Sequence, residues 1–130
     1  MRTPPICFVL AIAATLPLAS TAQEASLTKQ FNACMDKSGG VTQGMVECMV
    51  AETKRHDARL NKAYKALMGG LNPERQKQLQ EAQRAWLKFR DSNCAFYYDP
   101  DGGTLARVQA NDCVMNMTAN RAKELETLAQ

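Results

Sequence analysis

The stretch Glu81-Ala-Gln-Arg-Ala-Trp-Leu-Lys-Phe-Arg-Asp-Ser-Asn-Cys94 decides the fold of this chain. It contains neither Gly nor Pro, and it holds the only Trp of the sequence. Four of its side chains recur at helical steps and so share one face: Gln83, Trp86, Arg90 and Cys94. The polar members of this face need partners inside the protein or must reach water. We therefore predict a long amphipathic helix with a polar seam, and nothing in the stretch is typical of catalysis.

Glycine pairs divide the sequence before this helix. Gly39-Gly40 predicts the end of a short helix over about residues 23–37. A second helix is expected over about residues 43–68, capped by Thr42 and closed by Gly69-Gly70. Alternating steps of four and three give it a predicted inward stripe of Val46, Val50, Thr53, Asp57, Leu60, Tyr64 and Leu67.

The helix of the opening stretch begins with a strong start signal, Asn72-Pro73-Glu74. It is expected to fray near Tyr97, before a loop over residues 98–103. Thr104 is predicted to cap a last helix that ends near residue 129 and turns these side chains inward: Leu105, Val108, Met115, Ala122 and Leu125. No strand pattern or repeat appears. The predicted fold class is all-α, built from up-down helical hairpins with one short and three long helices.

The first 22 residues have the pattern of a secretory signal peptide. A basic start is followed by an uncharged apolar run over residues 6–18 and by the small residues Ser20-Thr-Ala22. We expect cleavage after Ala22, which leaves residues 23–130 as a single domain. Cys7 lies inside the apolar run without a lipobox before it, so no lipoprotein anchor is expected. The sequence thus predicts an exported protein, either periplasmic or secreted.

The charge of the mature chain is mild. Removing Arg2 from the 16 basic residues leaves 15 against 13 acidic ones, a net charge of about +2. This balance argues against a nucleic acid or an anionic membrane surface as the partner. The sequence does not predict an oligomeric state.

Four cysteines remain after the signal peptide: Cys34, Cys48, Cys94 and Cys113. An even number in an exported chain favours two disulfides, for which three pairings exist. Residues equidistant from the turn of a helical hairpin lie side by side, and the glycine pairs then favour Cys34–Cys48 with Cys94–Cys113. Crossed pairings stay open if the helix ends meet elsewhere. Each short loop closure would contribute about 3 kcal/mol in the chain-entropy model.

Residues that could carry chemistry are few. His56 is the only histidine, and its charged neighbours favour a solvated side chain over a catalytic one. No ligands are spaced for a metal, and Met115 and Met117 point apart on a helix, so the methionines are interpreted as core filler. Phosphate loops, nucleophile motifs and close carboxylate pairs are lacking. We predict neither enzymatic activity nor a cofactor.

Asp57 and Arg90 form a possible polar pair. In an antiparallel hairpin their side chains lean toward one another and converge beside Trp86. The alternative, that Arg90 pairs with solvent or with Asp91, is equally open. Trp86 is expected to be buried near Leu60 and Asp57.

Two strings of residues carry a resemblance to a known family. Asp57-Ala-Arg-Leu60-Asn61-Lys-Ala-Tyr64 precedes Ala82-Gln-Arg-Ala-Trp86-Leu-Lys-Phe-Arg90-Asp91-Ser-Asn-Cys94. Over about residues 34–125 the chain resembles the LprI-type lysozyme inhibitors. The resemblance implies a disulfide-stapled helical domain outside the cytoplasm that inhibits a host-type lysozyme by protein–protein contact. We interpret these matching residues as fold determinants: Asp57, Leu60, Asn61, Tyr64, Gln83, Trp86 and Arg90.

The loop after the opening stretch is the predicted partner surface. Tyr97, Tyr98, Asp99 and Asp101 combine aromatic area with a compact acidic spot, which suits a basic lysozyme. Phe96 or one Tyr could instead pack beneath the hairpin, and the acidic residues are also ordinary turn formers. Two other functions remain open: an envelope-interaction module without inhibitory activity, and a small-ligand carrier that uses gaps between helices.

Overall fold

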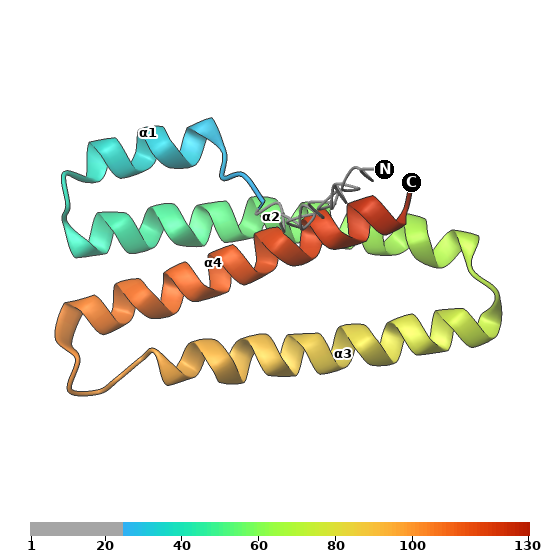
Figure 1. The fold of residues 1–130 in the computed structure, drawn as a ribbon. Coiled ribbons are helices and arrows are strands. Elements are labelled where there is room, and N and C mark those ends of the chain that lie inside the picture. Colours follow the sequence, from blue (N-terminus) through green and yellow to red (C-terminus); the bar gives the residue numbers. More distant parts are fainter. Residues whose placement is uncertain (1–24) are drawn as a thin grey trace, which may run out of the picture.

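The computed structural model describes residues 25–130, which form four helices (Figure 1). They are α1 (Lys29–Ser38), α2 (Thr42–Gly70), α3 (Pro73–Phe96) and α4 (Gly103–Leu128). The all-α fold with one short and three long helices is therefore confirmed. The expected signal peptide over residues 1–22 lies outside the described residues.

Several helix ends differ from the prediction. Helix α1 begins six residues later than expected, because Thr28 caps it and accepts a hydrogen bond from the backbone N–H of Phe31 at 3.2 Å. Thr42 is not the cap of α2, since Val41 occupies the cap position and Thr42 is already helical. Gly69-Gly70 form the last residues of α2 rather than its stop. The turn between α2 and α3 consists of Leu71 and Asn72 alone, so both glycines remain within α2.

Helix α3 starts as predicted, and α4 does not. Asn72 accepts from the backbone N–H of Arg75 at 3.0 Å, with Pro73 at the first helical position. Thr104 was expected to cap α4, but the helix already begins at Gly103, whose φ of 61° favours glycine. A Cβ at the preceding Gly102 would lie 2.8 Å from the Cβ of Ala106. The glycine pair thus lets the chain enter α4 two residues early.

The largest helix–helix interface joins α2 to α4, while α1 packs on α2 and α3 packs on α4. Figure 1 shows α1 on one side of the α2–α4 pair and α3 on the other. One core cluster joins α1, α2 and α4: Phe31, Cys48, Met49 and Met115. A second lies between α2 and α4, with Trp86 of α3 packed against it: Leu60, Ala63, Ala122 and Leu125. No helix within residues 25–130 is long and apolar enough to cross a membrane.

Both disulfides join neighbouring helices across their own turns. Cys34–Cys48 links α1 to α2 with a Cα–Cα distance of 5.7 Å, and Cys94–Cys113 links α3 to α4 with a distance of 5.5 Å. The pairing favoured by the two glycine turns is confirmed, and the crossed pairings are excluded.

The inward stripe of α2 is right in its C-terminal half, whereas its N-terminal half is wrong at Val50 and omits two buried polar residues. Leu60 is buried, and Tyr64 and Leu67 pack against the second cluster. Val50, however, is 40% exposed, while Glu52 and His56 are buried in its stead. The cause is that α1 and α4 both cover this part of α2 and supply polar partners to its charged face.

Helix α4 shows one similar correction. Leu105 was expected to face inward but is 62% exposed, because the small Ala106 is the residue packed beneath the α3–α4 turn. Met115, Ala122 and Leu125 are fully buried as predicted, and Val108 packs at the edge of the first cluster.

Candidate functional site

The α3–α4 turn presents aromatic and acidic side chains together. Phe96 is 85% exposed, so it does not pack beneath the hairpin, and its ring meets that of Tyr97 edge to face at 6.0 Å. Tyr97 and Tyr98 are also exposed. Asp99 and Asp101 both face solvent, and the Asp99 carboxylate accepts from the backbone N–H of Asp101 at 2.9 Å. The four residues predicted as a partner surface therefore lie on one exposed turn.

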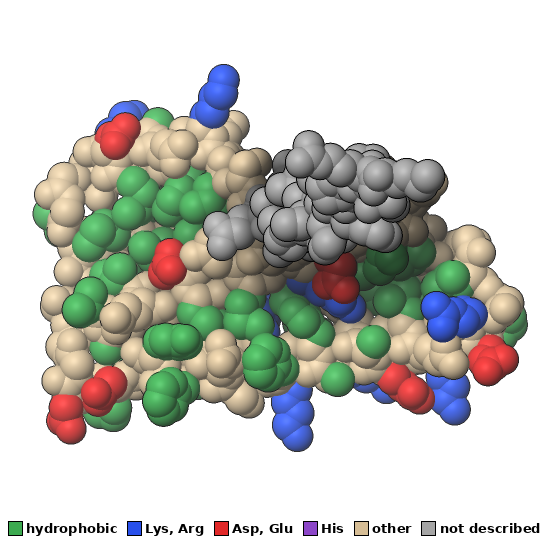
Figure 2. Space-filling model, in the orientation of Figure 1, with side chains coloured by type: hydrophobic (Ala, Val, Ile, Leu, Met, Phe, Trp, Pro, Cys, Tyr) green, Lys and Arg blue, Asp and Glu red, His purple; other side chains and the backbone are tan. Residues whose placement is uncertain are grey.

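The charge at this end differs from the charge of the adjoining helices. Residues 91–112 contain four aspartates and one arginine, whereas residues 54–90 contain ten Lys or Arg against three Asp or Glu. The one arginine, Arg107, reaches toward Gln43 of α2. Figure 2 shows acidic and hydrophobic side chains side by side at this end, with Lys and Arg projecting from the rest of α3. The turn is thus an acidic spot on a basic protein.

Two hollows flank Tyr97. The first, about 360 Å³, lies between α3 and α4 and is lined by Asn93, Tyr97, Gln109, Asp112, Cys113, Asn116, Met117 and Asn120. The second, about 560 Å³, lies on the turn itself and is lined by residues 95–100 and Gln109. The Cys94–Cys113 disulfide, whose Cys113 lines the first hollow, fixes the base of the turn. A rigid base lowers the ordering cost of binding a partner.

A second polar site, which the sequence reasoning missed, is buried where α1, α2 and α4 meet. The side chains of Glu52 and His56 are both fully buried. Glu52 accepts from the backbone N–H and the hydroxyl of Thr28, at 2.6 and 2.7 Å, and from Arg55 at 2.7 Å. The carboxylate thereby ties the start of α1 to α2.

His56 links this carboxylate to a second ion pair. Its Nε2 lies 3.0 Å from Glu52 and its Nδ1 lies 2.9 Å from Arg59. Because arginine only donates, Nδ1 must accept, so Nε2 carries the proton and donates to Glu52. Arg59 also donates two hydrogen bonds, at 2.9 and 2.6 Å, to Glu126 of α4. The chain of contacts thus spans all three helices.

These contacts set the charges of the buried groups. Burial lowers the pKa of His56, and the nearby Arg59 lowers it further against the opposing effect of Glu52. For Glu52, burial favours the neutral acid, but hydrogen bonds from Thr28 and Arg55 outweigh it and lower the pKa. The hydrogen bonds from Arg59 likewise lower the pKa of Glu126. At neutral pH the site therefore holds a neutral imidazole between ionised glutamates.

The expectation that His56 is solvated is therefore wrong. Its charged neighbours in the sequence are its partners rather than a sign of exposure. The steps of four and three that join Glu52, His56 and Arg59 place them on one helix face, and this spacing is the signal that could have revealed the site.

Asp57 and Arg90 do not form a pair. Arg90 donates to Asp91 at 2.9 and 2.8 Å and to Thr118 of α4 at 3.3 Å, while Asp57 accepts from Asn61 at 3.2 Å. The alternative in which Arg90 pairs with Asp91 is the one observed. The physical reason is that α3 packs on α4 and stands away from Asp57 of α2.

The remaining predicted structural residues lie where α3 meets α2 and α4. Trp86 is only half-buried, with the guanidinium groups of Arg90 and Arg121 at 5.3 and 5.9 Å from its ring centroid. Gln83 is buried and accepts from Arg121 at 3.0 Å. Tyr64 is half-buried and Asn61 is exposed. This junction is therefore more polar and more open than the core between α2 and α4.

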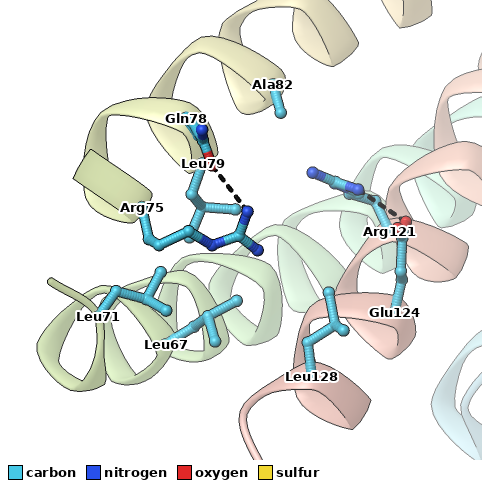
Figure 3. Close-up of a pocket in the computed structure, with 9 residues that line it drawn as sticks. All are labelled: Leu67, Leu71, Arg75, Gln78, Leu79, Ala82, Arg121, Glu124 and Leu128. Atoms are coloured by element: carbon cyan, nitrogen blue, oxygen red, sulfur yellow. Dashed lines mark hydrogen bonds and ion pairs between the residues drawn. The ribbon is translucent and has the colours of Figure 1, made fainter.

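An apolar cleft opens beside this junction (Figure 3). Its volume is about 450 Å³, and it is lined by Leu67, Leu71, Arg75, Gln78, Leu79, Ala82, Arg121, Glu124 and Leu128. The lining comes from the end of α2, the start of α3 and the end of α4. In Figure 3 the guanidinium groups of Arg75 and Arg121 project into the cleft from opposite sides, with leucines beneath them.

Sulfur and carboxylate groups form no metal site in the part of the chain that the structure describes. No cluster of three or more His, Cys, Asp or Glu side chains is suited to a metal ion there. Met115 is fully buried in the core, whereas the sulfur of Met117 lies 3.6 Å from Cys94 Sγ beside the disulfide.

Comparison with known proteins gives one family. The family described as Lysozyme inhibitor LprI matches residues 34–125, which include both disulfides and the α3–α4 turn. "Uncharacterized protein R02472" of Rhizobium meliloti (strain 1021) is 25% identical over 97 residues, which cover 64% of this chain and 70% of that protein. No solved structure matches the chain significantly.

Proposed function

The chain belongs to the LprI lysozyme inhibitor family, and on this premise we propose that it binds a lysozyme and inhibits it without catalysing a reaction. The observation that carries the proposal is the family match over residues 34–125. Fold alone would not support it, because a helical scaffold of this size serves many functions.

We further propose that the α3–α4 turn is the surface that contacts the lysozyme. Its support is the exposed set of Tyr97, Tyr98, Asp99 and Asp101 over a disulfide-fixed base. Tyrosines give large contact area at low entropic cost, and acidic groups suit a basic partner. The basic residues of the neighbouring helices argue against a lysozyme contact there, since like charges repel.

We also propose that the protein is exported from the cytoplasm. The signal-like sequence over residues 1–22 and two disulfides in a small chain are both typical of proteins that work outside the cytoplasm. A lysozyme inhibitor has its target in that compartment.

A lysozyme activity assay with purified protein tests the function, and a charge reversal tests the surface. We expect the unmodified protein to inhibit, and Asp99→Lys with Asp101→Lys to weaken inhibition at least about tenfold, with a weaker dependence on salt. The matched control is Glu74→Lys with Glu81→Lys, because these exposed acids lie in the first half of α3, away from the turn, and the change in net charge is the same.

The outcomes separate the two parts of the proposal. Equal inhibition by both double variants, with unchanged helical circular dichroism, would place the contact away from the turn. Absence of inhibition by the unmodified protein against basic animal and bacterial lysozymes would refute the function and leave the envelope-interaction module.

A further inference from the structure

We propose that the cleft between the α2–α3 turn and the end of α4 binds a single-chain aliphatic carboxylate. The cleft lies at the opposite end of α3 from the acidic turn, and binding there does not depend on lysozyme inhibition. It rests on the lining of the cleft, on its unbalanced charge and on its connection to Trp86.

The floor of the cleft is aliphatic. Leu67, Leu71 and Leu79 are half-buried, and Leu128 is 59% exposed at the end of α4. A volume of about 450 Å³ falls in the range of small-molecule sites. An alkyl chain would cover these leucines, whereas a sugar would leave them exposed to water.

The charge of the cleft is positive. The Arg75 guanidinium donates to the neutral amide of Gln78 at 2.7 Å and forms no ion pair with any residue in 25–130. Arg121 pairs with Glu124 at 2.7 Å, so one positive charge of the lining stays uncompensated. A carboxylate between the two guanidinium groups would balance it with charge-assisted hydrogen bonds, and a cationic head group would be repelled.

Trp86 lies near the cleft, so its fluorescence can report ligand binding. Arg121 lines the cleft and also lies 5.9 Å from the ring centroid of Trp86, the only tryptophan of the chain. A carboxylate bound to the Arg121 guanidinium changes the electric field at the indole. Ligand binding is therefore expected to change the tryptophan fluorescence.

The experiment titrates the purified full-length protein with sodium decanoate below its micelle concentration. Tryptophan fluorescence is read in parallel with calorimetric heat. We expect a saturable change with decanoate and none with decyltrimethylammonium, which has the same chain and the opposite charge. Arg75→Gln should weaken decanoate binding about tenfold or more, as for the loss of a charged hydrogen bond.

Lys77→Gln is the matched control, since it removes one exposed charge from the same turn of α3 without touching the lining. It should bind decanoate as the unmodified protein does. Leu67→Gln should weaken binding without removing the charge selectivity, and circular dichroism checks that each variant folds.

Three results would overturn the proposal: no saturable binding of decanoate, equal binding of the cationic amphiphile, or equal affinity in the Arg75→Gln variant. A separate titration uses phosphatidylglycerol vesicles in place of free decanoate. Binding to vesicles without binding of free decanoate would assign the cleft to a membrane surface and refute a free carboxylate as its ligand.

Discussion

The two flanks of the α2–α4 pair are built on different principles. On the α1 flank, Glu52 and His56 are fully buried, and their hydrogen-bond network extends to Glu126 of α4 through Arg59. On the α3 flank only Gln83 and Cys94 of the helix are buried, and Trp86 stays half-open between two arginines. Throughout residues 25–130 no buried side-chain N or O atom lacks a hydrogen-bond partner. On the α1 flank the partners are side chains and a backbone N–H group from neighbouring segments, whereas most polar groups of α3 face water.

This difference determines what a substitution costs. A partner removed from the α1 flank leaves a buried donor or acceptor that water cannot reach, and the full desolvation penalty then appears. A partner removed from the α3 flank is replaced by water. We therefore expect substitutions in the α1 flank to lower the free energy of unfolding more than substitutions in the α3 flank.

The largest expected loss of stability on the α1 flank comes from Glu52→Ala. It leaves Thr28 without an acceptor for two donors and His56 without its partner, so we expect a loss of about 3–5 kcal/mol in the free energy of unfolding. Urea unfolding at pH 7.5 measures it. A loss below about 1 kcal/mol would show that water enters the site.

Removal of the Cys94–Cys113 disulfide is the next largest change. Cys94→Ser with Cys113→Ser should cost about 3 kcal/mol through loop entropy, and it should loosen α3 more than α1 because the bridge joins α3 to α4. Hydrogen exchange followed along the chain separates the two helices. Equal loosening of α1 and α3 would contradict the division into two flanks.

Trp86→Ala should cost about 2 kcal/mol, below the range for fully buried aromatic residues, because the ring is half-open and its cationic neighbours can turn to solvent. Denaturant unfolding beside the Glu52→Ala variant gives the ratio of the two effects. If Trp86→Ala were the more damaging, the ranking of the flanks would be reversed.

The smallest expected effect is a dependence on pH that arises from one flank. The folded-state pKa of His56 is lowered, so unfolded chains bind the proton first and stability falls as pH drops below about 6.5. The lowered pKa values of Glu52 and Glu126 give stability that is present above about pH 4.3 and lost below it. His56→Gln should remove the upper window only. Unfolding free energies at pH 7.5, 5.5 and 4 measure both windows, and an unchanged slope between 7.5 and 5.5 in the variant would assign the dependence elsewhere.

Local signals in the sequence predict much of this fold. Gly39-Gly40 and Gly102-Gly103 mark two turns, and their symmetry predicts both disulfides. Leu60, Ala122 and Leu125 follow apolar spacing into the core. The exposed turn at Tyr97–Asp101 can be predicted from the sequence because its residues are typical of turns.

The misses have a common physical cause. Hydrophobic spacing treats Glu52 and His56 as solvent-facing, and only the arrival of Thr28 and Glu126 from other helices makes their burial possible. The leucine–arginine cleft is likewise formed by three separate segments, so no single stretch of the sequence predicts it. What the sequence does not reveal are features that depend on how helices meet.

The pairing of neighbouring cysteines also suits an ordered formation of the two disulfides. Each bridge joins cysteines that are consecutive in the described chain, with sequence separations of 14 and 19. For a chain delivered N-terminus first into an oxidising compartment, Cys48 is the first partner to reach Cys34, and the first hairpin can close before Cys94 has emerged. Cys113 then finds Cys94 as the only remaining thiol of the four. Vectorial delivery would thus lead to the native pairing without reshuffling, and a refolding chain released all at once would lose that advantage.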